Sequence, residues 1–150
     1  MILYGQSPGY SRITSPFGRR TAPTTGASTY HKGIDIGVPE GTPILAVTNG
    51  EITFTGFLGG GGYTITLTSG NLKISFCHVS PLYIVSEGDF VLQGQVIGHV
   101  GPKYVDYVPG NKYTDSSGRP TNGATTGPHL HLGFRLDNNY VNPLDYLSPE

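Results

Sequence analysis

The chain has 150 residues and a mass of 16.0 kDa, a size that fits one domain with its own core. Only 13% of its residues are charged and the net charge is −1, which argues against a nucleic-acid surface and against polybasic membrane attachment. The single cysteine, Cys77, excludes an internal disulfide, and we expect a buried thiol. No apolar stretch reaches about 18 residues, and no signal peptide is visible at the N-terminus, so no membrane insertion is expected.

The first third of the chain predicts short strands between loops. SPFGRR at 15–20 is typical of a strand end that runs into a turn, and the Thr-, Ser-, Gly- and Pro-rich stretch up to Tyr30 predicts an exposed loop. HKGIDIG at 31–37 is followed by a turn and a β-run, VPEGTPILAV at 38–47. With 23 glycines, 12 prolines and 10 tyrosines, the composition favours a turn-rich all-β domain.

The middle of the chain alternates apolar with small or polar residues, the period of two that half-buried strands show. Residues 51–56 and 63–68 both have this pattern, and four glycines lie between them at 59–62. We therefore expect two antiparallel strands joined by a glycine turn. Residues 72–79 continue the alternation, which places His78 at the end of an otherwise apolar row.

The segment at 85–100 echoes an earlier one, since VSEGDFVLQ follows VPEGTPILA at an offset of 47 residues. This predicts a duplicated turn-strand unit. His99, in the same segment, is expected to be an ordinary exposed or half-buried strand residue. Residues 102–125 lack sustained periodicity and predict a long ordered loop or a short hairpin excursion, a kind of segment that is often functional. A turn at 137–139 and an edge segment at 140–144 complete the pattern.

TGPHLHLGF at 126–134 contains the strongest chemical signal of the chain. In a strand, His129 and His131 point to one face, while Leu130 and Leu132 point to the other. The two histidine α-carbons would lie about 6.5 Å apart, close enough for both rings to reach one metal-centred site. Paired imidazoles beside leucines are costly unless they are hydrogen-bonded or metal-bound. The strand therefore predicts a site that needs further ligands.

Further ligands are available in HKGID at 31–35. A zinc enzyme needs about three nitrogen or oxygen ligands and an open position for water. In a straight strand His31 and Asp35 would lie about 13 Å apart, too far for one ion. We expect this segment to curl, with Gly33 and Gly37 supplying the backbone freedom.

Together these segments resemble the lysostaphin/LytM-type zinc endopeptidases, which cut peptidoglycan peptides. The matching pieces occur in family order and cover most of residues 13–147: SPFGRR at 15–20, HKGID at 31–35, GTPILAVTNGEI at 41–52, FCHVS at 76–80, EGDFVLQGQVIG at 87–98 and TGPHLHL at 126–132. The joint pattern is far more specific than any one motif.

Carried over position by position, the resemblance implies one zinc ion held by His31, Asp35 and His131. It implies His129 and His78 as catalytic imidazoles that do not bind the metal. One of them would take the proton of the attacking water and pass it to the leaving amine, while the other stabilises the oxyanion. We favour His129 as the base because it adjoins the ligand His131, and exchanged roles are the alternative.

The resemblance also implies the fold and the setting. We expect residues 1–150 to form one peptidase domain with a core at about 13–147, built as an antiparallel β-sheet or sandwich with a duplicated hybrid motif. A substrate groove would follow one sheet face. Bacterial peptidoglycan is the implied partner, reached outside the cytoplasm by a monomeric domain of a secreted protein, or by a bacteriophage tail or mobile-element lysin.

An insertion at about 102–125 departs from the family pattern, which has only a short segment there. We expect a solvated surface loop, and the alternative is that the loop forms one wall of the cleft, with Tyr104, Tyr107 or Tyr113 stacking on peptide or glycan. Tyr30, next to His31, is a candidate to offer its phenol to the oxyanion.

Two other function classes remain open from the sequence. LytM-like domains that lose ligands regulate other cell-wall hydrolases, although all five family positions are filled here. A biotinyl or lipoyl carrier is suggested by the turn-strand unit at 87–98. However, the candidate lysines for such a carrier, Lys73 and Lys103, lack the flanking methionine or alanine.

Overall fold

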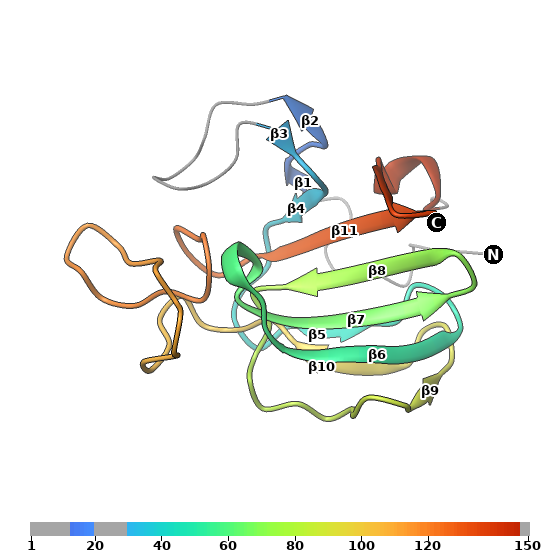
Figure 1. The fold of residues 1–150 in the computed structure, drawn as a ribbon, viewed down its shortest axis with the longest axis horizontal. Coiled ribbons are helices and arrows are strands. Elements are labelled where there is room, and N and C mark those ends of the chain that lie inside the picture. The colour runs from blue at the N-terminus through green and yellow to red at the C-terminus, as the bar shows by residue number, and fades with distance from the viewer. Residues whose placement is uncertain (1–12, 20–29, 148–150) are drawn as a thin grey trace.

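The computed structural model describes residues 13–19 and 30–147, and the regular structure of these residues is almost entirely β (Figure 1). The expected loop before Tyr30 lies outside the described residues. The main antiparallel sheet contains, in spatial order, β1 (Ile13–Ser15), β4 (Ile34–Ile36), β11 (Leu130–Leu136), β8 (Leu72–Cys77), β7 (Tyr63–Ser69), β6 (Gly50–Phe57) and β9 (Phe90–Val91), with β12 (Asn139–Val141) paired to β11. The predicted all-β antiparallel class is confirmed.

Two further strand pairs and two short 3₁₀ turns complete the described structure. β5 (Pro43–Leu45) pairs with β10 (Val96–His99), and β2 (Gly18–Arg19) pairs with β3 (Tyr30–His31). The 3₁₀ turns are η2 (Gly59–Gly61) and η3 (Pro143–Asp145). In the described part of the chain, no helix is long and apolar enough to cross a membrane.

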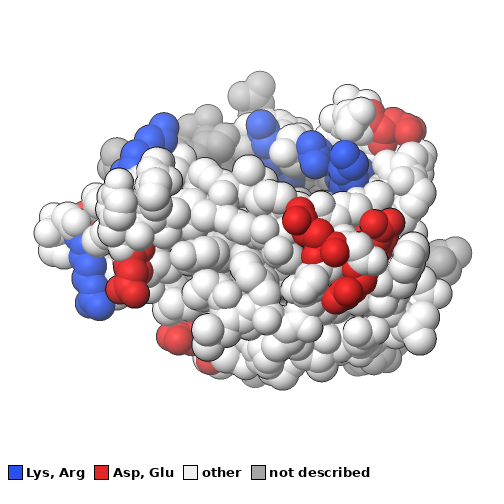
Figure 2. Space-filling model, turned by 60° about the horizontal axis from the view of Figure 1, so that its bottom comes forward, with Lys and Arg blue, Asp and Glu red and all other residues white. Residues whose placement is uncertain are grey.

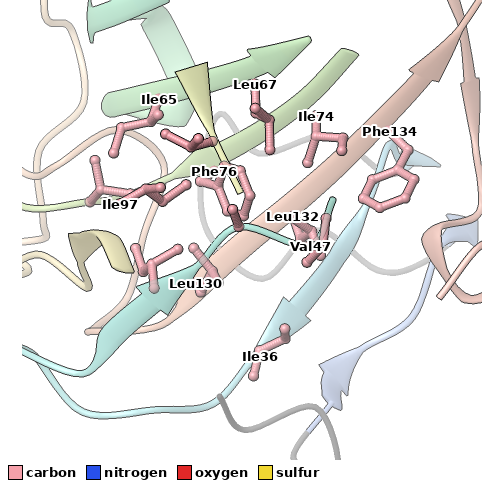
Figure 3. Close-up of a cluster of buried hydrophobic side chains, with 14 of the residues drawn as sticks. Ile36, Val47, Ile65, Leu67, Ile74, Phe76, Ile97, Leu130, Leu132 and Phe134 are labelled. Carbon is pink, nitrogen blue, oxygen red and sulfur yellow. The ribbon is translucent and has the colours of Figure 1, made fainter. Parts of the chain in front are cut away.

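The core lies between one face of the main sheet and the β5–β10 pair (Figure 3). Alternation along β8 and β11 sends one side chain in two into this layer, where Phe76, Leu132 and Phe134 have no exposed surface. Ile65 of β7 lies beside Phe76 on the same sheet face, and Ile97 of β10 closes the layer from its other side. Burial of each such side chain contributes about 1.5–3 kcal/mol to stability.

The same alternation leaves the opposite face of β8 and β11 free for polar residues. His131 lies opposite Cys77, and Gly133 lies opposite Ser75, in the antiparallel register of these strands. One face of this strand pair therefore builds the core, while the other presents the residues with chemical function.

The expected hairpin and the expected duplication are both present. β6 and β7 pair antiparallel from Glu51–Thr68 to Phe57–Tyr63, and the glycine connector between them forms η2. At the duplicated turns, Gly41 and Gly88 both have left-handed φ, at 87° and 96°. In each copy the next residue donates its N–H to the carbonyl three residues back, at 3.2 Å in the first copy and 3.0 Å in the second.

Residues 102–125 project beyond the strand ends, as the orange segment of Figure 1. They form a hairpin excursion, held by isolated bridges between Tyr104 and Thr121 and between Thr114 and Pro120. At its tip, Asp115 accepts hydrogen bonds from the backbone N–H groups of Ser117 and Arg119. These bonds order the segment without a strand.

Charged side chains are few and lie in small groups. On the face shown in Figure 2, small basic and acidic groups border wide areas without charge. This distribution matches the sparse and balanced charge of the sequence.

The bend between β3 and β4 depends on Gly33. A Cβ atom there would lie 2.3 Å from the carbonyl oxygen of Leu132 and 2.9 Å from the His131 ring. Gly33 is not among the glycines with left-handed φ, so our expectation that it supplies conformational freedom is wrong. It is required because a side chain would collide with β11.

We expect Gly33→Ala to lower the free energy of unfolding by about 1–3 kcal/mol, the usual range for overpacking. The new methyl group would press on the backbone of β11 and on the His131 ring. Denaturant titration followed by circular dichroism measures the change. Gly127→Ala is the matched control, since a Cβ there meets nothing within 4 Å. Equal losses in the two variants would contradict the packing argument.

Candidate metal centre and active-site cleft

Three side chains converge on one point at the edge of the main sheet. Nε2 of His31 lies 3.2 Å from Oδ1 of Asp35 and 3.1 Å from Nδ1 of His131, and the last two atoms are 2.9 Å apart. Ligand atoms about 2.1 Å from a tetrahedral zinc ion are separated by about 3.4 Å. The spacing of the three atoms is therefore close to that of three corners of such a site, and these residues form a group that could hold a metal ion.

Strand pairing places two of these ligands. Asp35 of β4 is the direct antiparallel partner of His131 of β11, so their side chains leave the sheet side by side. His31 reaches the same point from the end of β3, across the bend at Gly33. The curl that we expected between His31 and Asp35 is confirmed.

The hydrogen bonds of His31 determine its tautomer. Its Nδ1 lies 2.8 Å from the carbonyl oxygen of Pro16, which can only accept, so Nδ1 carries the proton. Nε2 of the neutral ring then presents a lone pair to Asp35 and His131. Acceptors that face one another at these distances repel unless a cation lies between them. The arrangement therefore fits a metal ion.

The protonation of Asp35 and His131 also suits metal binding. Burial opposes the ionisation of Asp35, but its close contacts with the rings of His129, His131 and His31 hold its pKa well below the usual range. Burial lowers the pKa of His131, against the attraction of Asp35. An ionised carboxylate and a neutral imidazole are the forms that bind metals.

His129 stands beside this centre. It precedes β11 and lies on the same face as His131, as alternation predicts, with Nε2 3.6 Å from Oδ1 of Asp35. Its Nδ1 lies 3.0 Å from the carbonyl oxygen of Gly127 and 3.2 Å from the hydroxyl of Thr125. Because the carbonyl can only accept, Nδ1 carries the proton and Nε2 faces the centre with a lone pair.

His78 faces the same cleft from the end of β8, with its ring centroid 4.6 Å from that of His129. The expectation that His78 shares a face with Leu72, Ile74 and Phe76 is wrong. β8 ends at Cys77, and His78 has a left-handed φ of 62°, which turns its side chain out of the apolar row. Nδ1 of His78 lies 2.7 Å from the carbonyl oxygen of Asn122.

The five residues lie in an open cleft of about 750 Å³. Tyr30 and Tyr113 line this cleft, whereas Tyr104 and Tyr107 do not. Tyr30 packs edge-to-face on Phe17, with ring centroids 5.7 Å apart. Tyr104 is turned into its own loop, where its hydroxyl bonds to Asp115 and Arg119 stacks over its ring at 3.9 Å.

Cys77 lies at the edge of this cleft and is buried, as expected. Burial raises the pKa of its thiol to about 12, which keeps the sulfur protonated at neutral pH. His99 is half-buried in β10, away from the cleft.

The residues that orient the imidazoles are not apparent from the sequence. Ser15 and Pro16 contact Nδ1 of His31, Thr125 contacts His129, and Asn122 contacts His78. Two of these contacts use backbone oxygens, which carry no residue-specific signal. Asn122 belongs to the inserted loop, where no periodic pattern marked it.

Comparison with known proteins gives one family. The model of peptidase family M23 matches residues 29–143. The chain is 36% identical over 141 residues to the DD-carboxypeptidase/endopeptidase Mpg of Neisseria meningitidis serogroup B, covering 93% of this chain and 28% of that protein. It is 30% identical over 143 residues to the peptidoglycan DD-endopeptidase ShyC of Vibrio cholerae serotype O1, covering 94% of this chain and 28% of that protein. The chain thus spans less than a third of the length of these curated relatives.

A solved structure agrees with the sequence relatives. The catalytic domain of lysostaphin from Staphylococcus simulans superposes with a TM-score of 0.69 at 26% identity, covering 89% of this chain and 90% of that one. The family model's range, 29–143, includes all five site residues. The resemblance predicted from the motifs is confirmed, and the chain belongs to peptidase family M23.

Proposed function

We propose that the chain is a zinc-dependent endopeptidase that hydrolyses peptide bonds in the stem peptides or crossbridges of bacterial peptidoglycan. The observation that carries this proposal is the convergence of the ligand atoms of His31, Asp35 and His131 in an open cleft, with two further imidazoles beside them. The relatives named as peptidoglycan endopeptidases support this substrate class.

The proposal includes the setting in which the chain would act. Residues 1–150 would form one peptidase domain that works as a monomer at the bacterial cell wall, outside the cytoplasm. His31, Asp35 and His131 would hold one zinc ion. When bound, that ion supplies a Lewis acid that polarises the peptide carbonyl and makes water acidic enough to attack at neutral pH.

His129 is the residue to which we assign proton uptake from the attacking water. Its Nε2 has a lone pair in the tautomer that Gly127 selects, and the carboxylate of Asp35 lies 3.6 Å away. A negative charge at that distance stabilises the imidazolium that forms. The proton on Nε2 is then available to the leaving amine.

His78 differs from His129 in that its side chain is buried. Burial, followed by the charges of His129 and His131, lowers its pKa to about 3, so the ring is neutral at physiological pH. With Nδ1–H directed to Asn122, Nε2 of His78 also presents a lone pair. His78 would therefore stabilise a developing oxyanion only while it shares the proton that the nearby ring of His129 has taken from water, before that proton passes to the leaving amine.

The walls of the cleft suggest where the peptide lies. Tyr30 stands on the β3 side next to His31, and Tyr113 stands on the side of η2 and the inserted loop. We assign substrate contacts to these two tyrosines, with the phenol of Tyr30 directed at the oxyanion. The position of Tyr104, inside its own loop, supports a structural role for that residue.

The direct test of the function uses purified protein and cell-wall fragments of several chemotypes. Mass spectrometry of the released muropeptides would identify the bond that is cut. We expect soluble peptides with new amine and carboxyl ends. A chain with one bound zinc and no cleavage of any wall type would instead support a regulatory role.

We expect Asp35→Ala to abolish retention of zinc. The variant leaves two imidazole nitrogens at the centre, and the remaining site lacks the anionic ligand that offsets the charge of the ion. Metal analysis after dialysis against a weak chelator measures zinc per chain, and about one is expected for the parent. His99→Ala is the control, because it removes an imidazole outside the cleft. Full zinc retention by Asp35→Ala would refute the ligand assignment.

We expect His129→Ala to keep its zinc and to lose about 10²–10⁴-fold in kcat on muropeptides, the usual size for removal of a general base. The ligand set is intact in this variant, so metal content and activity separate. Quantitative mass spectrometry of product formation gives the rate. An unchanged rate would remove His129 from the mechanism.

Stability should depend on pH through His78. The unfolded chain binds a proton at this histidine near pH 6.5, whereas the folded chain does so only near pH 3. The free energy of unfolding should therefore fall as the pH drops from about 6.5 towards 4, by up to about 1.4 kcal/mol per pH unit for this one proton. Equilibrium unfolding of the metal-free protein at several pH values measures the slope.

His78→Asn is the variant for this measurement. Asparagine tolerates left-handed φ, and its amide can donate to Asn122 without titrating. We expect a shallower slope between pH 6 and 4 than in the parent, with the remainder due to other groups such as His131. If the unfolding free energy changed with pH equally in His78→Asn and in the parent, folding would not lower the pKa of His78.

A further inference from the structure

Asn122 is fully buried, and all of its polar groups have partners. Its N–H donates to the carbonyl of Lys103 at 2.9 Å, and its own carbonyl accepts from Nδ1 of His78 at 2.7 Å. Its side-chain oxygen accepts from the N–H of Tyr63 at 2.8 Å, and its side-chain nitrogen donates to the carbonyl of Val79 at 3.0 Å. One residue thus links the start of β7, the residues after β8 and both ends of the inserted loop.

Glycines make the space that Asn122 occupies. A Cβ on Gly62 would lie 2.3 Å from both oxygens of Asn122, and one on Gly101 would lie 2.8 Å from its side-chain nitrogen. Gly62 ends the glycine connector before β7, and Gly101 precedes the inserted loop. The side chain of Asn122 therefore occupies space that Gly62 and Gly101, which are distant in sequence, leave open.

The backbone around His78 is held by the same segments. The N–H of His78 donates to the carbonyl of Gly61 at 2.8 Å, and its carbonyl accepts from the N–H of Gly101 at 2.9 Å. These bonds maintain the left-handed φ that turns the ring into the cleft. They fix the α-carbon of His78, while the orientation of the ring depends on the carbonyl of Asn122.

That carbonyl also selects the tautomer. It has only lone pairs, so a ring with its proton on Nε2 would place two lone pairs face to face at 2.7 Å. The favoured ring has Nδ1–H bonded to Asn122 and an Nε2 lone pair directed at the cleft. The side-chain bonds of Asn122 keep the carbonyl in place for this interaction.

We propose that Asn122 is a positioning residue for His78, whose side-chain amide anchors the carbonyl that sets the orientation and the tautomer of this imidazole. The proposal rests on the proposed function for its catalytic consequence, but the tautomer itself can be measured whether or not the chain cleaves peptidoglycan. Asn122 would act through His78 without touching substrate.

The test compares Asn122→Ala with Asn111→Ala in the zinc-loaded protein. Asn111 is a matched control, because its side chain also makes two bonds inside the loop, to Thr121 and Tyr113, without contacting His78. Long-range ¹H–¹⁵N NMR of the imidazole nitrogens reports the tautomer. The kinetics of muropeptide cleavage report kcat and KM.

For the parent we expect His78 to be the Nδ1–H tautomer. Asn122→Ala should show a mixture of tautomers, retain its zinc, and lose about 10–100-fold in kcat with little change in KM, a loss of the size found when the outer partner of a metal-bound histidine is removed. Asn111→Ala should match the parent in tautomer and in kcat. If Asn122 sets the Nδ1–H tautomer of His78 but the parent does not cleave muropeptides, the proposed function fails while this proposal stands.

Three results would overturn the proposal. The first is an Nε2–H tautomer of His78 in the parent, a measurement that needs no variant to fold. The second is an unchanged tautomer and kcat in folded Asn122→Ala. The third is an equal loss in Asn111→Ala, which would attribute the effect to the loop as a whole.

Discussion

The site depends first on the antiparallel register between β4 and β11. This register sets Asp35 directly opposite His131, although 96 residues separate them in the chain. A slip of one residue would turn Asp35 into the core and bring an isoleucine to the centre. The core residues Ile34, Ile36 and Leu132 prevent such a slip, because they are fully buried only in the observed register. Packing on one face of the sheet thus fixes the chemistry on the other.

Electrostatics then explains why these groups favour a cation. The carboxylate of Asp35 is surrounded by imidazoles, and at least one of them, His31, turns a lone pair towards it. Hydrogen bonds on the outer sides of the rings orient them before any ligand arrives, so little reorganisation is required at the centre. The same logic applies to His129 and His78, which both donate their outer hydrogen bonds to backbone carbonyls. Backbone carbonyls hold three imidazoles, those of His31, His129 and His78, without adding further charge to the cleft.

The inserted loop has two parts with different roles. Its tip is held by Asp115, Tyr104 and Arg119 and stands apart from the cleft. Its final residues fold back against the glycines of η2, where a Cβ on Gly123 would meet the carbonyl of Gly60 at 2.4 Å. The final residues of the loop are therefore packed against the catalytic side of the sheet. A long insertion is tolerated in such a position because its cost in closure entropy grows slowly with length.

The sequence by itself determined the local features of this protein. A period of two assigned Leu130 and Leu132 to the core and His129 and His131 to the other face, because alternation is a property of any strand. Tertiary structure alone decided the features that depend on distant contacts. His78 leaves the apolar row because backbone bonds to Gly61 and Gly101 hold its left-handed φ. Gly33 and Asn122 have their roles because other strands pass within contact distance of them, and no local pattern records such proximity.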